Sequence, residues 1–119
     1  MNINEINRKF RGKKIQQLTL SADKTEVIIC FDDGSRLFLS DPPSCCEQRY
    51  FHSDDKLSSI VGGEFYRMEL VDLGQRKHNA DIAFLWIYSS SGCVNICAYN
   101  EHTGNYGGFE IEGLTGDKT

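Results

Sequence analysis

The chain has 119 residues, of which 39% are hydrophobic and 25% charged, and its formal net charge is −4 at pH 7. This composition is that of a globular protein, and the length suits one domain with its own hydrophobic core. The acidic balance disfavours binding to duplex nucleic acid, which depends on cationic side chains that neutralise phosphates. We therefore predict a single domain over residues 1–119, with a frayed tail at 115–119.

The first half of the chain predicts a short helix followed by a three-stranded meander. Within residues 2–10, the apolar side chains follow helical spacing, and Asn2 or Asn4 can cap the helix. Asp33-Gly34 is typical of a hairpin turn, because this dipeptide tolerates a positive φ. The predicted strands, rich in β-branched and other apolar residues, cover residues 15–20, 26–31 and 36–39.

The middle of the chain is less regular. Pro42-Pro43 interrupts the sheet, and residues 49–52 can form a short strand. Residues 53–61 predict a second short helix, with Ser53 or Asp54 as its N-cap. The side chains that this helix turns inward are expected to be Leu57, Ile60 and Val61.

The second half of the chain returns to strands. Residues 64–73 show the alternation of a strand, and residues 93–99 and 109–112 form the last two. Residues 82–88 are almost all apolar, which indicates a central strand buried on both faces, with a buried Trp86 at its centre. The sequence thus predicts an α+β fold that is mainly antiparallel β-sheet, with about six to seven strands and two short helices in a single domain.

The segment Cys45–Asp55 carries the greatest chemical variety in the chain, with thiols, carboxylates, a guanidinium, an imidazole and two aromatic rings. It lies in a connection, where binding residues often sit on a rigid scaffold, and Tyr and Arg dominate the energetics of protein interfaces. We predict that the segment lies at the surface and contributes to binding, so that Arg49→Ala and His52→Ala leave stability nearly intact. The alternative is that it merely closes the core. The candidate binding residues are Glu47, Arg49, Tyr50, His52, Asp54, Asp55, Tyr99, Asn100, His102 and Tyr106.

Metal binding is disfavoured by the spacing of the cysteines. Cys93 and Cys97 on one strand lie about 13 Å apart, too far for a shared tetrahedral zinc ion. Cys45-Cys46 on an extended chain would point to opposite sides. We therefore predict no metal and no cofactor, and we expect the thiols to pack as small hydrophobic groups.

The sequence contains only weak indications of a catalytic or phosphate-binding site. Cys46, His52 and Asp54 are the residue types of a nucleophilic site, but nothing in their spacing guarantees contact, so we predict that the protein is not an enzyme. The basic cluster within residues 8–14 is either a solvated face or a small phosphate-binding or docking patch. Aromatic and amphipathic side chains near strand ends favour binding over catalysis.

The longest apolar run, at residues 82–88, falls far short of the roughly 20 residues that span a membrane. The polar start Met1–Glu5 lacks a signal-peptide core. We expect a cytoplasmic protein that does not contact a membrane, with its five cysteines as reduced thiols.

A series of motifs runs through the first half of the chain: Gly12-Lys13, Asp33-Gly34, Cys45-Cys46-Glu47, Asp54-Asp55-Lys56-Leu57 and Gly62. In this series the chain resembles a family of small uncharacterised proteins from bacteriophages and prophages. The second half is similar too, with a long strand around Trp86 and a hairpin to Cys93–Tyr99. The proline pair before the cysteines departs from the family pattern. The resemblance implies a phage origin rather than a mechanism.

We therefore predict a small phage-encoded accessory protein that acts by binding in the host cytoplasm. Its leading function is inhibition of a host antiphage defence protein, such as a CRISPR or other immune effector. One alternative is a sponge that sequesters a nucleotide immune signal, as a homo-oligomer, and a second is a small thiol or metal-dependent enzyme. Nucleic acid is not an expected partner.

Overall fold

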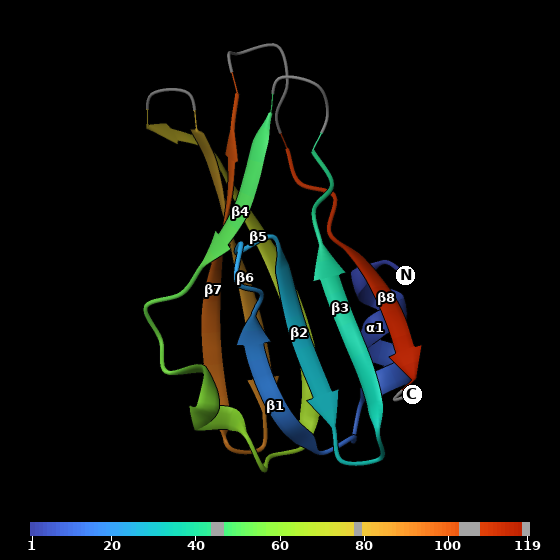
Figure 1. Ribbon diagram of the computed structural model, residues 1–119. Helices are drawn as coiled ribbons and strands as arrows, with labels where there is room; N and C mark the ends of the chain where they lie inside the picture. Colours follow the sequence, from blue (N-terminus) through green and yellow to red (C-terminus); the bar gives the residue numbers. More distant parts are fainter. Residues whose placement is uncertain (44–46, 78–79, 103–107, 118–119) are drawn as a thin grey trace.

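Two antiparallel sheets pack face to face in the computed structural model, and a single α-helix lies along one side of them (Figure 1). The structure describes residues 1–43, 47–77, 80–102 and 108–117. Over these residues it contains eight strands, one α-helix and one 3-10 turn. The mainly antiparallel prediction is confirmed, whereas the strand number and the second helix differ from the expectation.

The first sheet contains the predicted meander. β1 (Ile15–Leu20), β2 (Glu26–Phe31) and β3 (Ser35–Ser40) follow one another in space. Gly34 has φ +90° in the turn between β2 and β3, which is the conformation that the Asp-Gly sequence predicts. The fourth strand of this sheet, β8 (Glu112–Asp117), pairs with β3 along its whole length.

The position of β8 corrects the bounds of the predicted last strand, residues 109–112, and it includes residues 115–117 of the predicted tail. Gly113 interrupts the alternation of apolar and polar side chains by which a strand is recognised in a sequence. A Cβ at Gly113 would lie 2.7 Å from Ile6 Cδ1, and one at Gly116 would lie 3.0 Å from the Phe38 ring. Side chains of Ile6 and Phe38 therefore occupy the space beside these glycines. The strand can pair with β3 although its own sequence has no apolar alternation.

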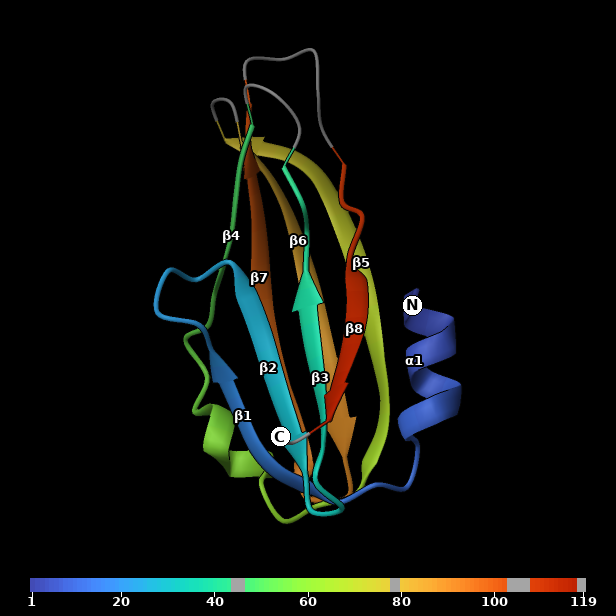
Figure 2. The same cartoon turned by 45° about the vertical axis from the view of Figure 1, so that its right-hand side comes forward.

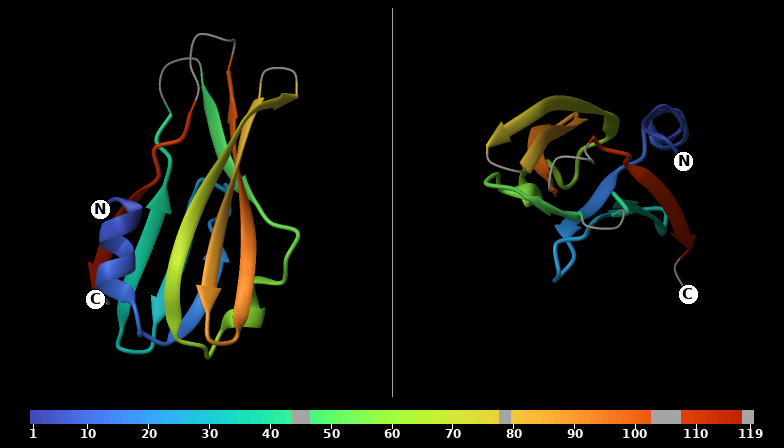
Figure 3. Two further views of the ribbon diagram at one scale, coloured as in Figure 1. Left: turned by 180° about the vertical axis from the view of Figure 1, so that it is seen from behind. Right: turned by 90° about the horizontal axis from the view of Figure 1, so that it is seen from above.

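The second sheet has the order β4-β7-β6-β5. Its strands are β4 (Gln48–His52), β5 (Phe65–Lys77), β6 (Ala80–Ser89) and β7 (Gly92–Glu101). A view from above shows the two sheets as separate layers with the helix beside them (Figure 3).

β6 is not buried on both faces, which corrects the sequence prediction. Ala83, Leu85 and Ile87 are buried against the other sheet, whereas alternate residues, Trp86 among them, are only partly buried. The physical reason is that a two-layer sandwich covers only one face of each sheet, and among the described residues no element packs over the outer face of β6.

The helix α1 (Ile3–Phe10) is capped by Asn2, whose side chain accepts a hydrogen bond from the backbone N–H of Glu5. The Glu5 carboxylate in turn accepts one from the backbone N–H of Asn2. Ile6 and Phe10 are buried, and Phe10 stacks on Phe31 at 5.0 Å between ring centroids. Figure 2 shows α1 beside β5 and β8, where it closes one open side between the sheets.

The predicted second helix is only a 3-10 turn, η1 (Leu57–Ile60). Lys56 takes its N-cap position and makes no side-chain cap hydrogen bond. Ser53, a predicted cap, accepts from the Asp55 N–H and donates to the carbonyl of Asn95 on β7. Ile60 is buried as expected, but Val61 is 39% exposed. No helix within the described ranges has the length and apolar character needed to cross a membrane.

Candidate functional site

The pairing of β4 with β7 brings together most of the predicted site residues from two distant parts of the sequence. Tyr50 lies opposite Tyr99, and Arg49 lies opposite Asn100. Because successive side chains of a strand point to opposite faces, this ladder divides the residues into an outer and an inner group. Three residues discussed above, Cys45, Cys46 and Tyr106, lie outside the described residues.

The outer group is centred on two stacked tyrosines. The Tyr50 and Tyr99 rings lie 5.0 Å apart at an interplanar angle of 14°. The Tyr50 hydroxyl donates to Glu101 Oε2 at 2.6 Å, and this hydrogen bond raises the pKa of Tyr50 to about 12. Beyond the stack, His52 Nε2 lies 2.9 Å from Asp54 Oδ1, with both side chains well exposed.

The inner group forms a buried polar cluster of Asp41, Glu47, Arg49 and Asn100. Arg49 Nη1 lies 2.7 Å from Asp41 Oδ1, and Nη2 lies 2.9 Å from both Glu47 oxygens. Asn100 Nδ2 donates to Glu47 Oε2 at 3.0 Å. The side chains of Arg49 and Glu47 are only 8% and 1% exposed.

This burial corrects the prediction that Arg49 is a surface residue. Its guanidinium connects Asp41, just after β3, with Glu47 and β4, so its contacts tie the two sheets together. Burial raises the pKa of Asp41 even though the Glu110 N–H and Arg49 favour the charged carboxylate. The cluster positions the ends of strands and does not present Arg49 to a partner.

His102 is also buried. Its Nε2 lies 3.1 Å from Asp81 Oδ2, which additionally accepts a hydrogen bond from the Gly108 N–H. The pair lies where β6 begins and β7 ends, next to the point at which the described chain resumes at Gly108. Of the predicted binding residues, Glu47, Arg49, Asn100 and His102 thus face the interior.

Sequence reasoning missed a larger feature, the outer face of the second sheet. We call Tyr50, Phe84, Trp86, Tyr88 and Tyr99 the aromatic face, because all five lie on this side and are only partly buried. Phe84 and Trp86 meet edge to face at 6.3 Å. The signal was present in the sequence, since every second residue from 84 to 88 is aromatic while the intervening ones are aliphatic.

Carboxylates border the aromatic face. Glu69 on β5 lies opposite Trp86, and Glu101 accepts the Tyr50 hydroxyl. Asp55 Oδ2 accepts the Asn95 N–H of β7 at 2.7 Å. Burial raises the pKa of Tyr99, and the negative charge of nearby Asp54 adds to this effect. The border is therefore acidic on several sides.

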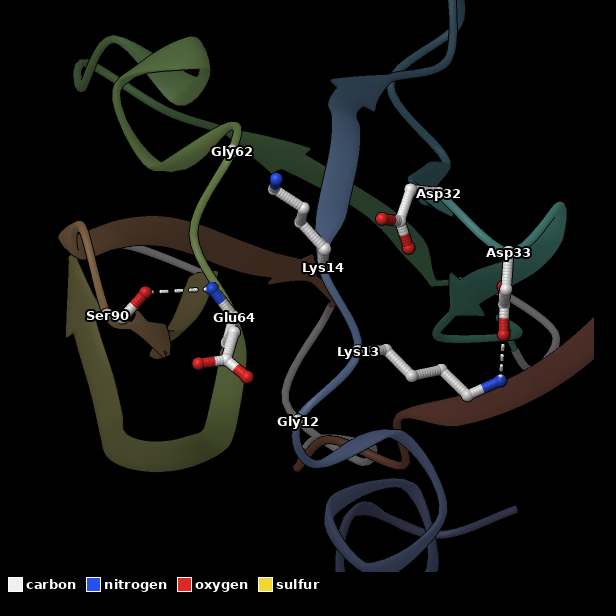
Figure 4. Close-up of a pocket in the computed structure, with 8 residues that line it drawn as sticks. All are labelled: Gly12, Lys13, Lys14, Asp32, Asp33, Gly62, Glu64 and Ser90. Atoms are coloured by element: carbon white, nitrogen blue, oxygen red, sulfur yellow. Dashed lines mark hydrogen bonds and ion pairs between the residues drawn. The ribbon is translucent and has the colours of Figure 1, made fainter.

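A separate pocket of about 610 Å³ lies at the end of the sandwich where β1 begins (Figure 4). Lys13 Nζ lies 2.7 Å from Asp33 Oδ2 and also donates to Ser35 Oγ at 3.2 Å. Part of the basic cluster of the N-terminal region is thus neutralised by the chain itself. The lining contains no aromatic side chain and consists of Gly12, Lys13, Lys14, Asp32, Asp33, Gly62, Glu64 and Ser90.

Within the described parts of the chain, no three His, Cys, Asp or Glu side chains gather as a possible metal-ion site. The described cysteines, Cys30, Cys93 and Cys97, are free thiols. Burial raises the pKa of Cys97, so its thiol is held in the protonated, less nucleophilic form.

No protein-family model, curated protein or solved structure matches this chain. The resemblance to bacteriophage proteins therefore stays a prediction, and the function is argued from the geometry of the site.

Proposed function

We propose that this protein acts by binding another protein, and that the aromatic face is its contact surface. The observation that carries the proposal is the set of five partly buried aromatic rings on one face of a sheet, with Tyr50 stacked on Tyr99 and Phe84 against Trp86. Tyrosine and tryptophan bury a large area at low entropic cost and dominate the energetics of protein interfaces.

The rigidity of this surface supports a binding role. β6 and β7 pair from Ala80–Glu101 to Ser89–Gly92, so the rings project from a continuous ladder. The buried polar cluster also anchors β4 through Arg49, one residue before Tyr50. A surface that is held in place before binding loses less conformational entropy when a partner docks.

A nucleotide sponge is less well supported. Sequestering a nucleotide calls for aromatic rings and cationic groups in one concave site. Here the rings lie on the aromatic face, whereas no aromatic side chain lines the pocket in Figure 4. Lys13 lies over the Phe10 ring, but that ring is fully buried and offers no face to a base. A thiol enzyme is also less well supported. Cys97 lies opposite His52 in the β4–β7 ladder, but burial raises the pKa of its thiol, and the His52 ring nitrogen lies against Asp54 instead.

The proposed partner is a host protein, in the host cytoplasm, and the resemblance to phage proteins directs the search to antiphage defence effectors such as those of CRISPR systems. Binding that covers the working surface of such an effector would inhibit it without any cofactor or catalysis. This part of the proposal rests on the resemblance and not on the site.

The experiment compares two double variants of the tagged protein in cross-linked, infected host cells. Trp86→Thr with Tyr99→Thr alters the aromatic face. Phe38→Thr with Leu114→Thr is the control on the first sheet, where these two residues lie opposite each other on β3 and β8. We expect the face variant to lose the cross-linked partner and to stop protecting the phage against host defence. The control should keep both properties.

The readout is mass spectrometry of the cross-linked species together with phage plating efficiency. Thermal unfolding of both variants checks that they fold. If the folded face variant retains the partner at the level of the control, the aromatic face is not the contact surface.

A further inference from the structure

We infer that the aromatic face accepts arginine side chains from a basic segment of the partner protein. This inference rests on the proposed binding function and adds the chemistry of the partner. It comes from a contact that the protein makes with itself on the same face.

Arg67 already shows how a guanidinium sits on this surface. Arg67 lies opposite Tyr88 in the β5–β6 ladder, and its Cζ atom lies 4.2 Å from the centre of the Tyr88 ring. Its Nη1 is 3.7 Å from Glu69 Oε2, two residues along the same strand. One cation is thus held between an aromatic ring and a carboxylate.

Carboxylates also lie beside the other rings of the face, and one of them is Glu69, the carboxylate that pairs with Arg67. Glu69 lies opposite Trp86, and Glu101 is bonded to Tyr50, which stacks on Tyr99. Among the side chains that the structure describes, no lysine or arginine lies over the rings of Tyr50, Trp86 or Tyr99. These positions offer a partner the contacts that Arg67 makes at Tyr88.

Charge selects the kind of partner. Aromatic rings on a sheet can stack on the bases of single-stranded nucleic acid, but such sites also carry cations that follow the phosphates. Here the border contains Asp54, Asp55, Glu69 and Glu101, with Arg67 already engaged by Glu69. This border repels phosphates and attracts a cationic protein segment.

Arginine fits better than lysine. The guanidinium is planar, stacks on aromatic rings and forms paired hydrogen bonds with a carboxylate, whereas the lysine ammonium is a more strongly hydrated point charge. A segment rich in arginine is also what proteins use to bind nucleic acid, so occupation of the face by such a segment would compete with the partner's own ligand.

Trp86 gives a direct test, because it is the only tryptophan in the chain. The full-length protein is titrated at low ionic strength with equal-length peptides that alternate glycine with arginine, lysine or glutamate, and with a single-stranded DNA oligonucleotide. We expect Trp86 fluorescence to respond most strongly to the arginine peptide, with an affinity at least about threefold above that of the lysine peptide. The glutamate peptide and the DNA should give no response.

Two double variants complete the test. Glu69→Gln with Glu101→Gln removes the charges of the border, and we expect it to weaken binding of the arginine peptide by about fivefold or more. Glu26→Gln with Glu112→Gln changes the net charge equally on the other sheet and should bind nearly as the unaltered protein does.

Equal binding of the arginine and lysine peptides, no response to either, binding of the DNA, or an equal effect of the two variants would overturn the inference. These outcomes are separate from the test of the proposed function. If Trp86→Thr with Tyr99→Thr abolishes partner capture but the peptides show no preference, the binding surface stands and only the arginine inference fails.

Discussion

At the scale of single residues, the buried polar cluster explains why the most reactive-looking part of the sequence is structural on its inner side. Arg49 holds two carboxylates, Asp41 and Glu47, that are almost fully removed from water. A buried ion pair often contributes little net stability, but removal of one partner leaves an uncompensated charge. The raised pKa of Asp41 shows that burial is already costly with Arg49 in place.

We therefore predict that Arg49→Ala lowers the free energy of unfolding by about 3–5 kcal/mol. This expectation is opposite to the one that the sequence suggests. Urea denaturation measures the effect, and Arg36→Ala, at an exposed position on β3, is the control that should change stability little. A small loss for Arg49→Ala would mean that the cluster is wet and opens easily.

The turn between β2 and β3 gives a prediction for pH. Lys13, with Ser35, holds the pKa of Asp33 well below its usual value of 3.8. A carboxyl group whose pKa is depressed by folding stabilises the protein above its unfolded pKa, and this contribution disappears as the pH falls through the folded value. The stability advantage of the unaltered protein over Asp33→Asn should thus shrink below about pH 4.

Thermal unfolding at a series of pH values between neutrality and strong acid tests this expectation. Asp23→Asn, in the turn between β1 and β2, offers a comparison, because hydrogen bonds from Thr25 and Ser21 lower the pKa of Asp23 without a lysine partner. A difference between Asp33→Asn and the unaltered protein that stays constant with pH would show that the Lys13 contact does not form in solution.

At the scale of elements, the sequence predicted local structure well and the environment of each face less well. The helix at Asn2 and the Asp33-Gly34 turn follow from local chemistry, and both were correct. The predicted bounds of β8 were wrong because Ile6 and Phe38, from elsewhere in the fold, occupy the space beside its glycines. The sequence of β8 itself therefore shows no apolar pattern. The inner position of Arg49 likewise depends on the register of β4 against β7, which sequence spacing does not determine.

β6 provides the prediction at this scale. Leu85 is fully buried, whereas Trp86 is only partly buried on the outer face. Leu85→Ala should cost about 2–5 kcal/mol of unfolding free energy, and Trp86→Thr should cost clearly less because threonine retains strand propensity. Urea denaturation of the two variants measures this contrast, and a larger loss for Trp86→Thr would indicate that a further layer covers the outer face.

At the scale of the whole molecule, the fold leaves one sheet face both aromatic and bordered by carboxylates. The two-layer arrangement uses the inner faces for the core, with α1 closing one side (Figure 2). The outer group of the β4–β7 ladder, Tyr50 and Tyr99, belongs to the predicted binding set, whereas Phe84, Trp86 and Tyr88 join it only through the fold.

The most direct test of the aromatic face as the contact surface is hydroxyl-radical footprinting of the protein alone and bound to its captured partner. We predict that Trp86 and Tyr99 are oxidised in the free protein and protected in the complex. Leu114, which is 66% exposed on β8 of the other sheet, should be labelled equally in both states. Protection of Leu114, with Trp86 and Tyr99 labelled as strongly in the complex as in the free protein, would contradict the account.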